Sequence, residues 1–229
     1  MENKKEINAG IIIIGNEILS GRTQDTNTVT LSVWLNSLGI KVQEVRVIPD
    51  IEKTIIDTVN ELRSRFNYVF TTGGIGPTHD DITASSISKA FNLNYGPHKE
   101  AMSILEKYYK PGEFNDGRQK MAWMPTTANL ILNPTSGAPG FNVENVFCLP
   151  GVPSILKSML GGITNKLIGG DPILSQTINL RTVESEIAKS LSKVQDDNIE
   201  VDIGSYPFFR AGKLGVAIVL RCSDQNKIE

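Results

Sequence analysis

The chain has 229 residues, of which 40% are hydrophobic and 21% charged, as in an ordinary globular protein. Its 23 Lys and Arg against 25 Asp and Glu leave a formal net charge of -2, which excludes a general attraction to nucleic acid or anionic membranes. The polar start MENKKEIN and the short apolar runs predict neither a signal peptide nor a membrane span. The two cysteines, Cys148 and Cys222, lie inside apolar runs and predict buried thiols in a reducing cytoplasm.

Apolar runs alternate with helical patterns over the first 91 residues. Strands are predicted at 7–14, 40–48 and 68–72, and helices after Asp25 or Thr26, after Asp50 and after Asp80 or Asp81. This β-α-β-α-β-α order predicts a three-layer α/β/α fold with a mostly parallel sheet. Ligands bind beyond the carboxyl ends of such strands. We therefore expect GNEILSG, VIPD and TTGGIGPTHDD to lie together along that edge of the sheet, which we call the rim.

The second half of the chain has a less regular pattern. Residues 97–124 are predicted to be helical with a break at Pro111, and 129–132 and 146–149 to be short strands on either side of the loop NPTSGAPG. A helix is predicted from Pro153 to about residue 168. The stretch GGDP at 169–172 favours a boundary between a main domain, 7–170, and a small α+β subdomain, 171–229, of order β-α-β-β.

The stretch TTGGIGPTHDD, residues 71–81, is predicted to be a tight turn between a strand and a helix. Glycines allow a backbone to approach a ligand closely, and free N–H groups at a helix start favour an anion such as phosphate. The turn matches neither the nucleotide P-loop nor the dinucleotide fingerprint. The candidate phosphate ligands are therefore the residues of the turn itself, namely Gly73, Gly74, Gly76 and Thr78.

Asp80 and Asp81 follow the turn and would repel a phosphate unless a cation lay between them. Mg²⁺ commonly bridges one or two carboxylates to phosphates, so this acidic pair predicts a metal-binding edge. A plain alternative is that one aspartate caps the next helix and the other is solvated. The same capping alternative applies to Asp50, and to Asp25 with its neighbours Thr26 and Asn27.

Four motifs in order, GNEILSG with DTN, TTGGIGPTHDDIT, NPTSGAPGF and LPGVPS, resemble the N-terminal domain of the competence-damage-inducible protein A (CinA) family. That domain belongs to the MoaB/Mog molybdopterin-binding superfamily, and the motifs cover about residues 9–160. The tail, with ESEIAKSL and IGSYPFF, resembles the following segment of CinA-like proteins and a region of eukaryotic FAD synthases. The 229 residues leave no room for the amidase domain of full-length CinA, so amidase activity is not expected.

The resemblance implies site residues position by position. Asp50 and Asp81 match the two aspartates treated as catalytic in the Mog branch, and Asp80 with Asp81 is the expected metal pair. The acidic pair is typical of CinA-like chains, whereas Asn16 stands where threonine often occurs. Further ligand-contact candidates follow from the motifs or their neighbourhood: Glu17, Asn27, Lys120, Asn133, Gly137, Pro139, Gly140, Pro150, Gly151 and Pro153.

The activity implied first is divalent-metal-dependent cleavage of a nucleotide pyrophosphate such as ADP-ribose or FAD, with Mg²⁺, Mn²⁺ or Co²⁺. Asp50 or Glu17 would orient or deprotonate the attacking water, and Lys120 or Arg22 would neutralise the leaving phosphate. The alternatives are a molybdopterin-binding or adenylyl-transfer protein and a non-catalytic nucleotide-binding module. The expected partners are a small nucleotide or pterin and further copies of the chain, as a dimer or trimer.

Overall fold

The computed structural model describes residues 7–210 and 212–228, which form two compact units. Unit 1 comprises residues 7–35 and 40–169, and unit 2 comprises residues 36–39 and 170–228. Within the described ranges, no helix combines the length and the apolar character needed to cross a membrane.

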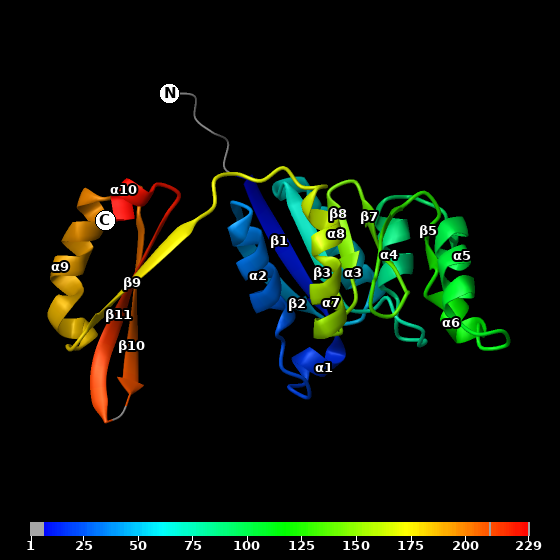
Figure 1. The fold of residues 1–229 in the computed structure, drawn as a ribbon, viewed down its shortest axis with the longest axis horizontal. Helices are drawn as coiled ribbons and strands as arrows, with labels where there is room; N and C mark the ends of the chain where they lie inside the picture. The colour runs from blue at the N-terminus through cyan, green and yellow to red at the C-terminus, as the bar shows by residue number, and fades with distance from the viewer. Residues whose placement is uncertain (1–6, 211, 229) are drawn as a thin grey trace. The chain divides into compact units, whose positions relative to one another are not determined.

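Unit 1 is built on a six-stranded sheet of order β2-β1-β3-β8-β7-β6 (Figure 1). Strands β1 (Ile7–Ile14), β2 (Ile40–Ile48), β3 (Tyr68–Thr72) and β8 (Val146–Leu149) are parallel. Strand β7 (Gly140–Val143) is antiparallel to β8, and β6 (Asn129–Ile131) is antiparallel to β7. The apolar, branched run of β1 suits a strand that is covered on both faces.

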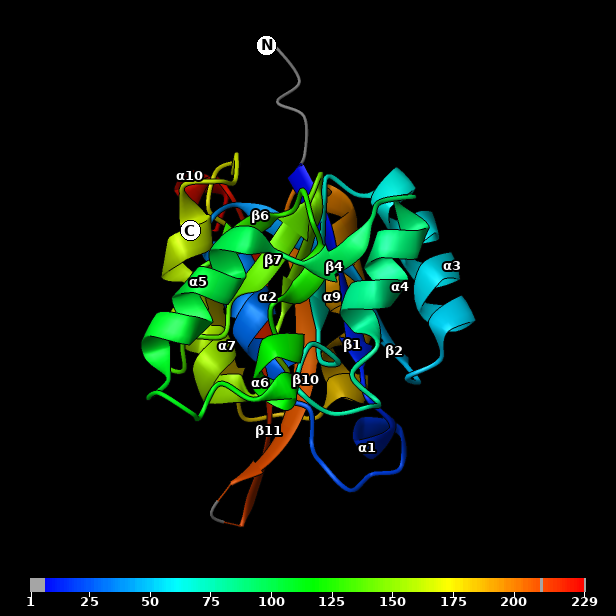
Figure 2. The same ribbon diagram turned by 90° about the vertical axis from the view of Figure 1, so that its right-hand side faces the viewer.

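Helices cover both faces of this sheet. The Trp34 ring of α2 (Asn27–Ser37) packs edge-on against Phe70 of β3, with centroids 5.8 Å apart. A Cβ on Gly10 would lie 2.8 Å from the ring of Phe66, the residue that follows α3 (Glu52–Arg65). Because Ile11 pairs with Phe70 and neighbouring residues point to opposite faces, α2 and α3 lie on opposite sides. The predicted three-layer fold is confirmed, with α7 (Pro153–Met159) on the α2 side and α4 (Thr83–Ala90) beside α3 (Figure 2).

Several predictions of local structure in unit 1 were wrong. Residues 97–124 hold α5 (Lys99–Tyr108) and α6 (Asp116–Lys120), but the ends of this range pair as strands β4 (Tyr95–Pro97) and β5 (Trp123–Pro125). Strand β7 begins at Gly140 and was not predicted, because its glycine and asparagine extend the polar loop before it. The helix from Pro153 ends at Met159 and is followed by the short α8 (Gly161–Thr164). One helical turn, α1 (Asn16–Leu19), forms within GNEILSG and was not predicted.

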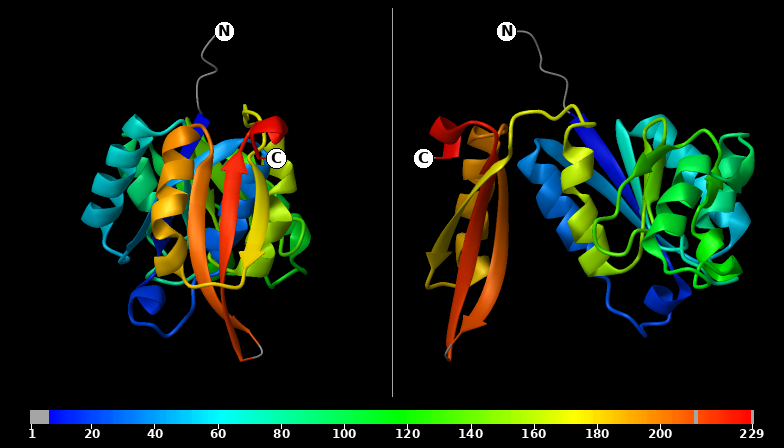
Figure 3. Two further views of the ribbon diagram at one scale, coloured as in Figure 1. Left: turned by 90° about the vertical axis from the view of Figure 1, so that its left-hand side faces the viewer. Right: turned by 45° about the vertical axis from the view of Figure 1, so that its right-hand side comes forward.

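Unit 2 has the predicted β-α-β-β order in β9 (Leu174–Leu180), α9 (Glu184–Asp197), β10 (Asp202–Arg210) and β11 (Lys213–Cys222) (Figure 3). The strands form an antiparallel sheet of order β10-β11-β9, and the chain continues into α10 (Gln225–Ile228). The Gln195 side chain of α9 accepts from the Ile203 N–H of β10. Helix α9 has no buried residue, so unit 2 has a sparse core around Val216 and Ile218.

Candidate ligand site at the strand ends of unit 1

The carboxyl ends of β1, β2, β3 and β8 meet at one edge of the sheet, because the four strands are parallel. The residues that follow β1 and β3 are each bonded to the last residue of a neighbouring strand. The N–H of Gly15 donates to the carbonyl of Ile48 over 3.2 Å, and the N–H of Gly73 donates to the carbonyl of Leu149 over 3.1 Å. The expected rim is therefore present, and Figure 1 shows α1 at this edge.

The glycine turn after β3 is held in a conformation that requires glycine. Gly73 and Gly74 have φ of 101° and 67°, in the region that L side chains rarely adopt. A Cβ on Gly73 would lie 2.1 Å from the Ile14 carbonyl oxygen, and one on Gly74 would lie 2.2 Å from Thr83 Oγ1. Thr83 fixes the turn, since its hydroxyl donates to the Gly73 carbonyl and its N–H to the Gly74 carbonyl, both over 2.9 Å. Thr83 was not identified from the sequence, although its place at the start of α4 was a usable signal.

Asp81 folds back onto the glycine turn instead of capping α4. Its Oδ2 accepts from the Thr78 N–H over 2.8 Å and from the Thr78 hydroxyl over 2.6 Å. A Cβ on Gly76 would lie 2.7 Å from the same oxygen. The residue before α4 is Ile82, with no side-chain cap, so the capping alternative for Asp80 and Asp81 is wrong. The start of α4 therefore keeps backbone N–H groups without a side-chain cap beside the turn.

Asp80 and Lys120 complete the charge pattern of the turn. Hydrogen bonding from the Thr78 side chain, then from the backbone N–H of Asp80 itself, holds the pKa of the Asp80 carboxyl below its ordinary value. The hydrogen bond of the Thr78 hydroxyl itself goes to Asp81. The Lys120 ammonium donates to the Thr78 carbonyl and so anchors α6 on the turn. A cation thus lies beside the acidic end of the turn.

Asp50 also has a partner other than the start of α3: it bonds to the first residue of α1. Its Oδ2 accepts from the Asn16 N–H over 2.9 Å, while the residue before α3 is Ile51, with no side-chain cap. The capping alternative for Asp50 is therefore wrong, and the carboxylate joins the segments after β1 and β2. Glu17 lies exposed in α1. Among the hydrogen bonds of the described residues, none joins Asp50 to Asp81.

Asn27 connects three segments of the rim. Asp25 caps α2 as predicted, because its Oδ1 accepts from the N–H groups of Asn27 and Thr28 over 2.9 and 3.3 Å. The Asn27 amide nitrogen donates to Thr72 Oγ1 at the end of β3 over 3.2 Å, and to the Gly151 carbonyl after β8 over 2.8 Å. Asn27 is 5% exposed, so these bonds are shielded from water. Its amide donors serve the protein rather than a ligand.

The loop between β6 and β7 has internal contacts of its own. Asn133 Oδ1 accepts from the N–H groups of Thr135 and Ser136, and its amide donates to Ser136 Oγ and the Ala138 carbonyl. A Cβ on Gly137 would meet the Tyr108 ring at 2.7 Å. The two residues that end the loop, Pro139 and Gly140, are buried, and a Cβ on the glycine would lie 2.5 Å from the Cys148 carbonyl oxygen.

Pro150 and Gly151, by contrast, immediately follow β8, and a Cβ on Gly151 would lie 3.4 Å from Gly73 Cα. Pro153 begins α7. The structure thus brings Asn27, Gly73 and Gly151 together and places Asn133 and Gly137 in a separate loop.

The carboxylates suit a metal shared with a ligand better than a metal held by protein alone. Over the part of the chain that the structure describes, no three histidine, cysteine, aspartate or glutamate side chains gather closely enough to hold a metal ion. Mg²⁺ is usually held by one or two carboxylates together with substrate phosphates. Asp80 and Asp81 beside the glycine turn fit that second arrangement in residue type and position.

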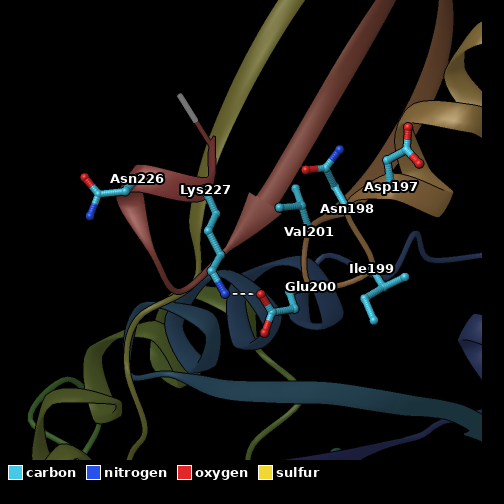
Figure 4. Close-up of a pocket in the computed structure, with 7 residues that line it drawn as sticks. All are labelled: Asp197, Asn198, Ile199, Glu200, Val201, Asn226 and Lys227. Carbon is cyan, nitrogen blue, oxygen red and sulfur yellow. Dashed lines mark hydrogen bonds and ion pairs between the residues drawn. The ribbon is translucent and has the colours of Figure 1, made fainter.

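Unit 2 has a cleft of about 610 Å³ at the end of α9 and beside α10 (Figure 4). An ion pair between Lys227 and Glu200 lies within it. None of the site residues predicted from the sequence is among those that line it, which are Asp197, Asn198, Ile199, Glu200, Val201, Asn226 and Lys227.

Comparison with known proteins agrees with this architecture. Residues 10–169 match the family described as "Probable molybdopterin binding domain", and residues 172–229 match the middle domain of FAD synthase. A protein of Archaeoglobus fulgidus is 35% identical over 197 residues, covering 86% of this chain and 84% of its own. A protein of Pyrobaculum calidifontis is 35% identical over 210 residues, covering 87% and 80%.

A solved structure, that of the CinA protein of unknown function from Thermoplasma acidophilum, is also similar. It is 31% identical, with a TM-score of 0.65 over 69% of this chain and 96% of its own. The fold and the rim thus define a molybdopterin-binding-type α/β domain. The chain belongs to the family of probable molybdopterin-binding domains, as a CinA-like member, which confirms the resemblance seen in its motifs.

Proposed function

We propose that the rim of unit 1 binds a phosphate-bearing pterin of the molybdopterin type, with the phosphate on the Gly73–Gly74 turn. The observation that carries this proposal is the turn itself, in which two glycines at positive φ are locked by Thr83 beside the uncapped start of α4. Backbone N–H groups at a helix start favour an anion without a basic side chain. The family described as molybdopterin-binding supports the pterin as the rest of the ligand.

Binding is tested with the whole chain and a panel of ligands measured by calorimetry. The panel contains molybdopterin, ADP-ribose, FAD, NAD and ATP, each with and without Mg²⁺, and a pterin that carries no phosphate. The proposal expects saturable binding of molybdopterin and loss of binding when the phosphate is missing. Equal affinity for the phosphate-free pterin would contradict a phosphate site at the turn.

A second candidate function is metal-dependent cleavage of a nucleotide pyrophosphate. It is favoured by Asp50 and Asp81, two rim carboxylates that do not cap the helices following them, α3 and α4, and by the similarity of residues 172–229 to a domain of FAD synthase. In this candidate Asp80 and Asp81 hold a divalent cation, which stabilises charge that develops on the phosphate oxygens. Asp50 or Glu17 takes a proton from the attacking water, and Lys120 neutralises the leaving phosphate.

The two candidates are separated by product analysis on the same panel. With Mg²⁺, Mn²⁺ or Co²⁺, cleavage releases AMP from ADP-ribose and FAD, whereas a binding protein returns both ligands intact. Release of AMP that persists unchanged in Asp81→Asn would point to a contaminating enzyme and would count against the second candidate.

A further inference from the structure

Asn27 is the residue through which three separate segments of the rim are held together. Its backbone N–H bonds to Asp25 at the start of α2, and its amide nitrogen bonds to Thr72 at the end of β3 and to Gly151 after β8. Gly151 in turn lies against Gly73, since a Cβ added to Gly151 would be 3.4 Å from Gly73 Cα. Besides the backbone bond from the Gly73 N–H to the Leu149 carbonyl, both donors of the Asn27 amide therefore join the phosphate turn to the segment after β8.

The same side chain has an unfavourable feature. Asn27 Oδ1 is buried and has no hydrogen-bond partner, although the residue is only 5% exposed. A buried acceptor without a partner costs stability, so the amide oxygen gives no reason for an asparagine at this position, and the reason lies in the two donor bonds. The asparagine amide suits this position because its two donors reach Thr72 and Gly151, whose segments form the rim.

We propose that Asn27 is a positioning residue of the ligand site, which sets the Gly73–Gly74 turn against the Pro150–Gly151 segment without touching the ligand through its amide. This inference rests on the proposed function, because the turn is the site whose geometry Asn27 fixes. It assigns Asn27 a role different from the direct ligand contact expected from the sequence motif. Thr72 has a part in this role as one of the two acceptors.

The test compares two buried asparagines in unit 1. Asn27→Leu removes both donors and the unpaired acceptor, whereas Asn142→Leu removes the single bond from Asn142 to the Glu144 carbonyl in the β7–β8 hairpin, away from the rim. Three quantities are measured for each: the urea midpoint, the calorimetric affinity for inorganic pyrophosphate with Mg²⁺, and hydrogen exchange at the Gly73 amide. If Asn27→Leu does not fold, Asn27→Ala takes its place.

We expect Asn27→Leu to lower the urea midpoint more than Asn142→Leu, because it removes two bonds rather than one, and to weaken pyrophosphate binding by at least ~10-fold, while Asn142→Leu leaves the affinity unchanged. Exchange at the Gly73 amide should become faster only in the Asn27 variant. Thr72→Val should weaken binding by about 3- to 10-fold, and Thr72→Ser, which keeps the hydroxyl, should retain most of it. This rescue would not occur if Thr72 acted only by filling space.

Unchanged affinity and unchanged Gly73 exchange in Asn27→Leu would overturn the positioning role. So would an equal loss of affinity in Asn142→Leu, because general destabilisation would then explain both variants. If the wild-type chain binds no pyrophosphate and none of the panel ligands, the proposed function fails. The exchange measurement still decides whether Asn27 holds the turn in that case, because it needs no ligand.

Discussion

The Gly73–Gly74 turn of unit 1 and the Gly212 turn of unit 2 differ in how tightly their glycines are enclosed. In unit 1 the Gly73–Gly74 turn is enclosed by backbone and by Thr83, above a sheet with buried side chains on both faces. In unit 2, Gly212 also has a positive φ but would meet nothing within 4 Å, and α9 has no buried residue. Positive φ alone therefore does not mark a site, whereas positive φ under close confinement by strand ends indicates a preorganised one.

The largest expected effect is on the free energy of unfolding, when alanine replaces Gly73 and, for comparison, Gly212. Gly73→Ala combines a strained φ with a 2.1 Å approach to the Ile14 carbonyl, so we expect a loss of about 2–6 kcal/mol of unfolding free energy. Gly212→Ala has the strain without the clash and should cost about 1 kcal/mol. Urea unfolding measures both variants, and equal losses would remove the distinction between the two turns.

A charge removed from the rim should affect turnover more than folding. Asn at position 81 can still accept from the Thr78 N–H, so Asp81→Asn preserves the turn while removing its charge. If the second candidate function holds, AMP release should fall by at least ~100-fold. The matched control is Asp57→Asn on α3, which loses an exposed ion pair with Lys53 and should keep full activity. Equal turnover in both variants would exclude a catalytic role for Asp81.

A substitution that creates a cavity in the core of unit 2 should leave ligand binding at the rim of unit 1 unaffected. Val216 is fully buried in β11, so Val216→Ala should lower the unfolding free energy by about 1–3 kcal/mol. Because the proposed ligand contacts all lie in unit 1, affinity for molybdopterin or pyrophosphate should remain that of the wild type. A parallel loss of affinity would show that unit 2 contributes to the site.

The two cysteines give the smallest contrast. Burial raises the pKa of the Cys148 thiol to about 12, so it remains protonated and unreactive at neutral pH, whereas Cys222 is partly exposed. Iodoacetamide at pH 8 should therefore modify Cys222 and spare Cys148 until the protein is unfolded, as mass spectrometry can show. The raised pKa also means that this thiol stabilises the fold below its ordinary pKa near 9, a contribution lost as the pH rises towards 12.

The fold of unit 1 could be predicted because its signals are local and repeated. The branched run of β1 and the amphipathic α3 each carry their own period, and their order fixes the parallel sheet. Strand β7 could not be predicted, because GFNV is only four residues long, contains glycine and asparagine, and is extended through its pairing with β6 and β8. The strands at either end of residues 97–124 form for the same reason, through pairing between distant segments.

The positions of the candidate residues could be predicted further than their bonds. The sequence placed Asp50 and Asp81 on one rim and offered helix capping as an alternative use for the two carboxylates, whereas Asn27 was a candidate through its motif only. Their real partners, Asn16 and Thr78, depend on the path of the loops in space. The link from Asn27 to Gly151 spans 124 residues and leaves no local signal in the sequence. Hydrogen bonds between loops of different strands thus require the structure.

The central claim is that the glycine turn holds the phosphate of the ligand. The most direct measurement follows the backbone amide resonances of an isotopically labelled chain during titration with molybdopterin and with the phosphate-free pterin. We expect large shifts at Gly73 and Gly74 with molybdopterin, far smaller shifts there with the phosphate-free pterin, and none at Gly212 with either. Saturable binding of molybdopterin without a change at Gly73 or Gly74 would contradict this claim.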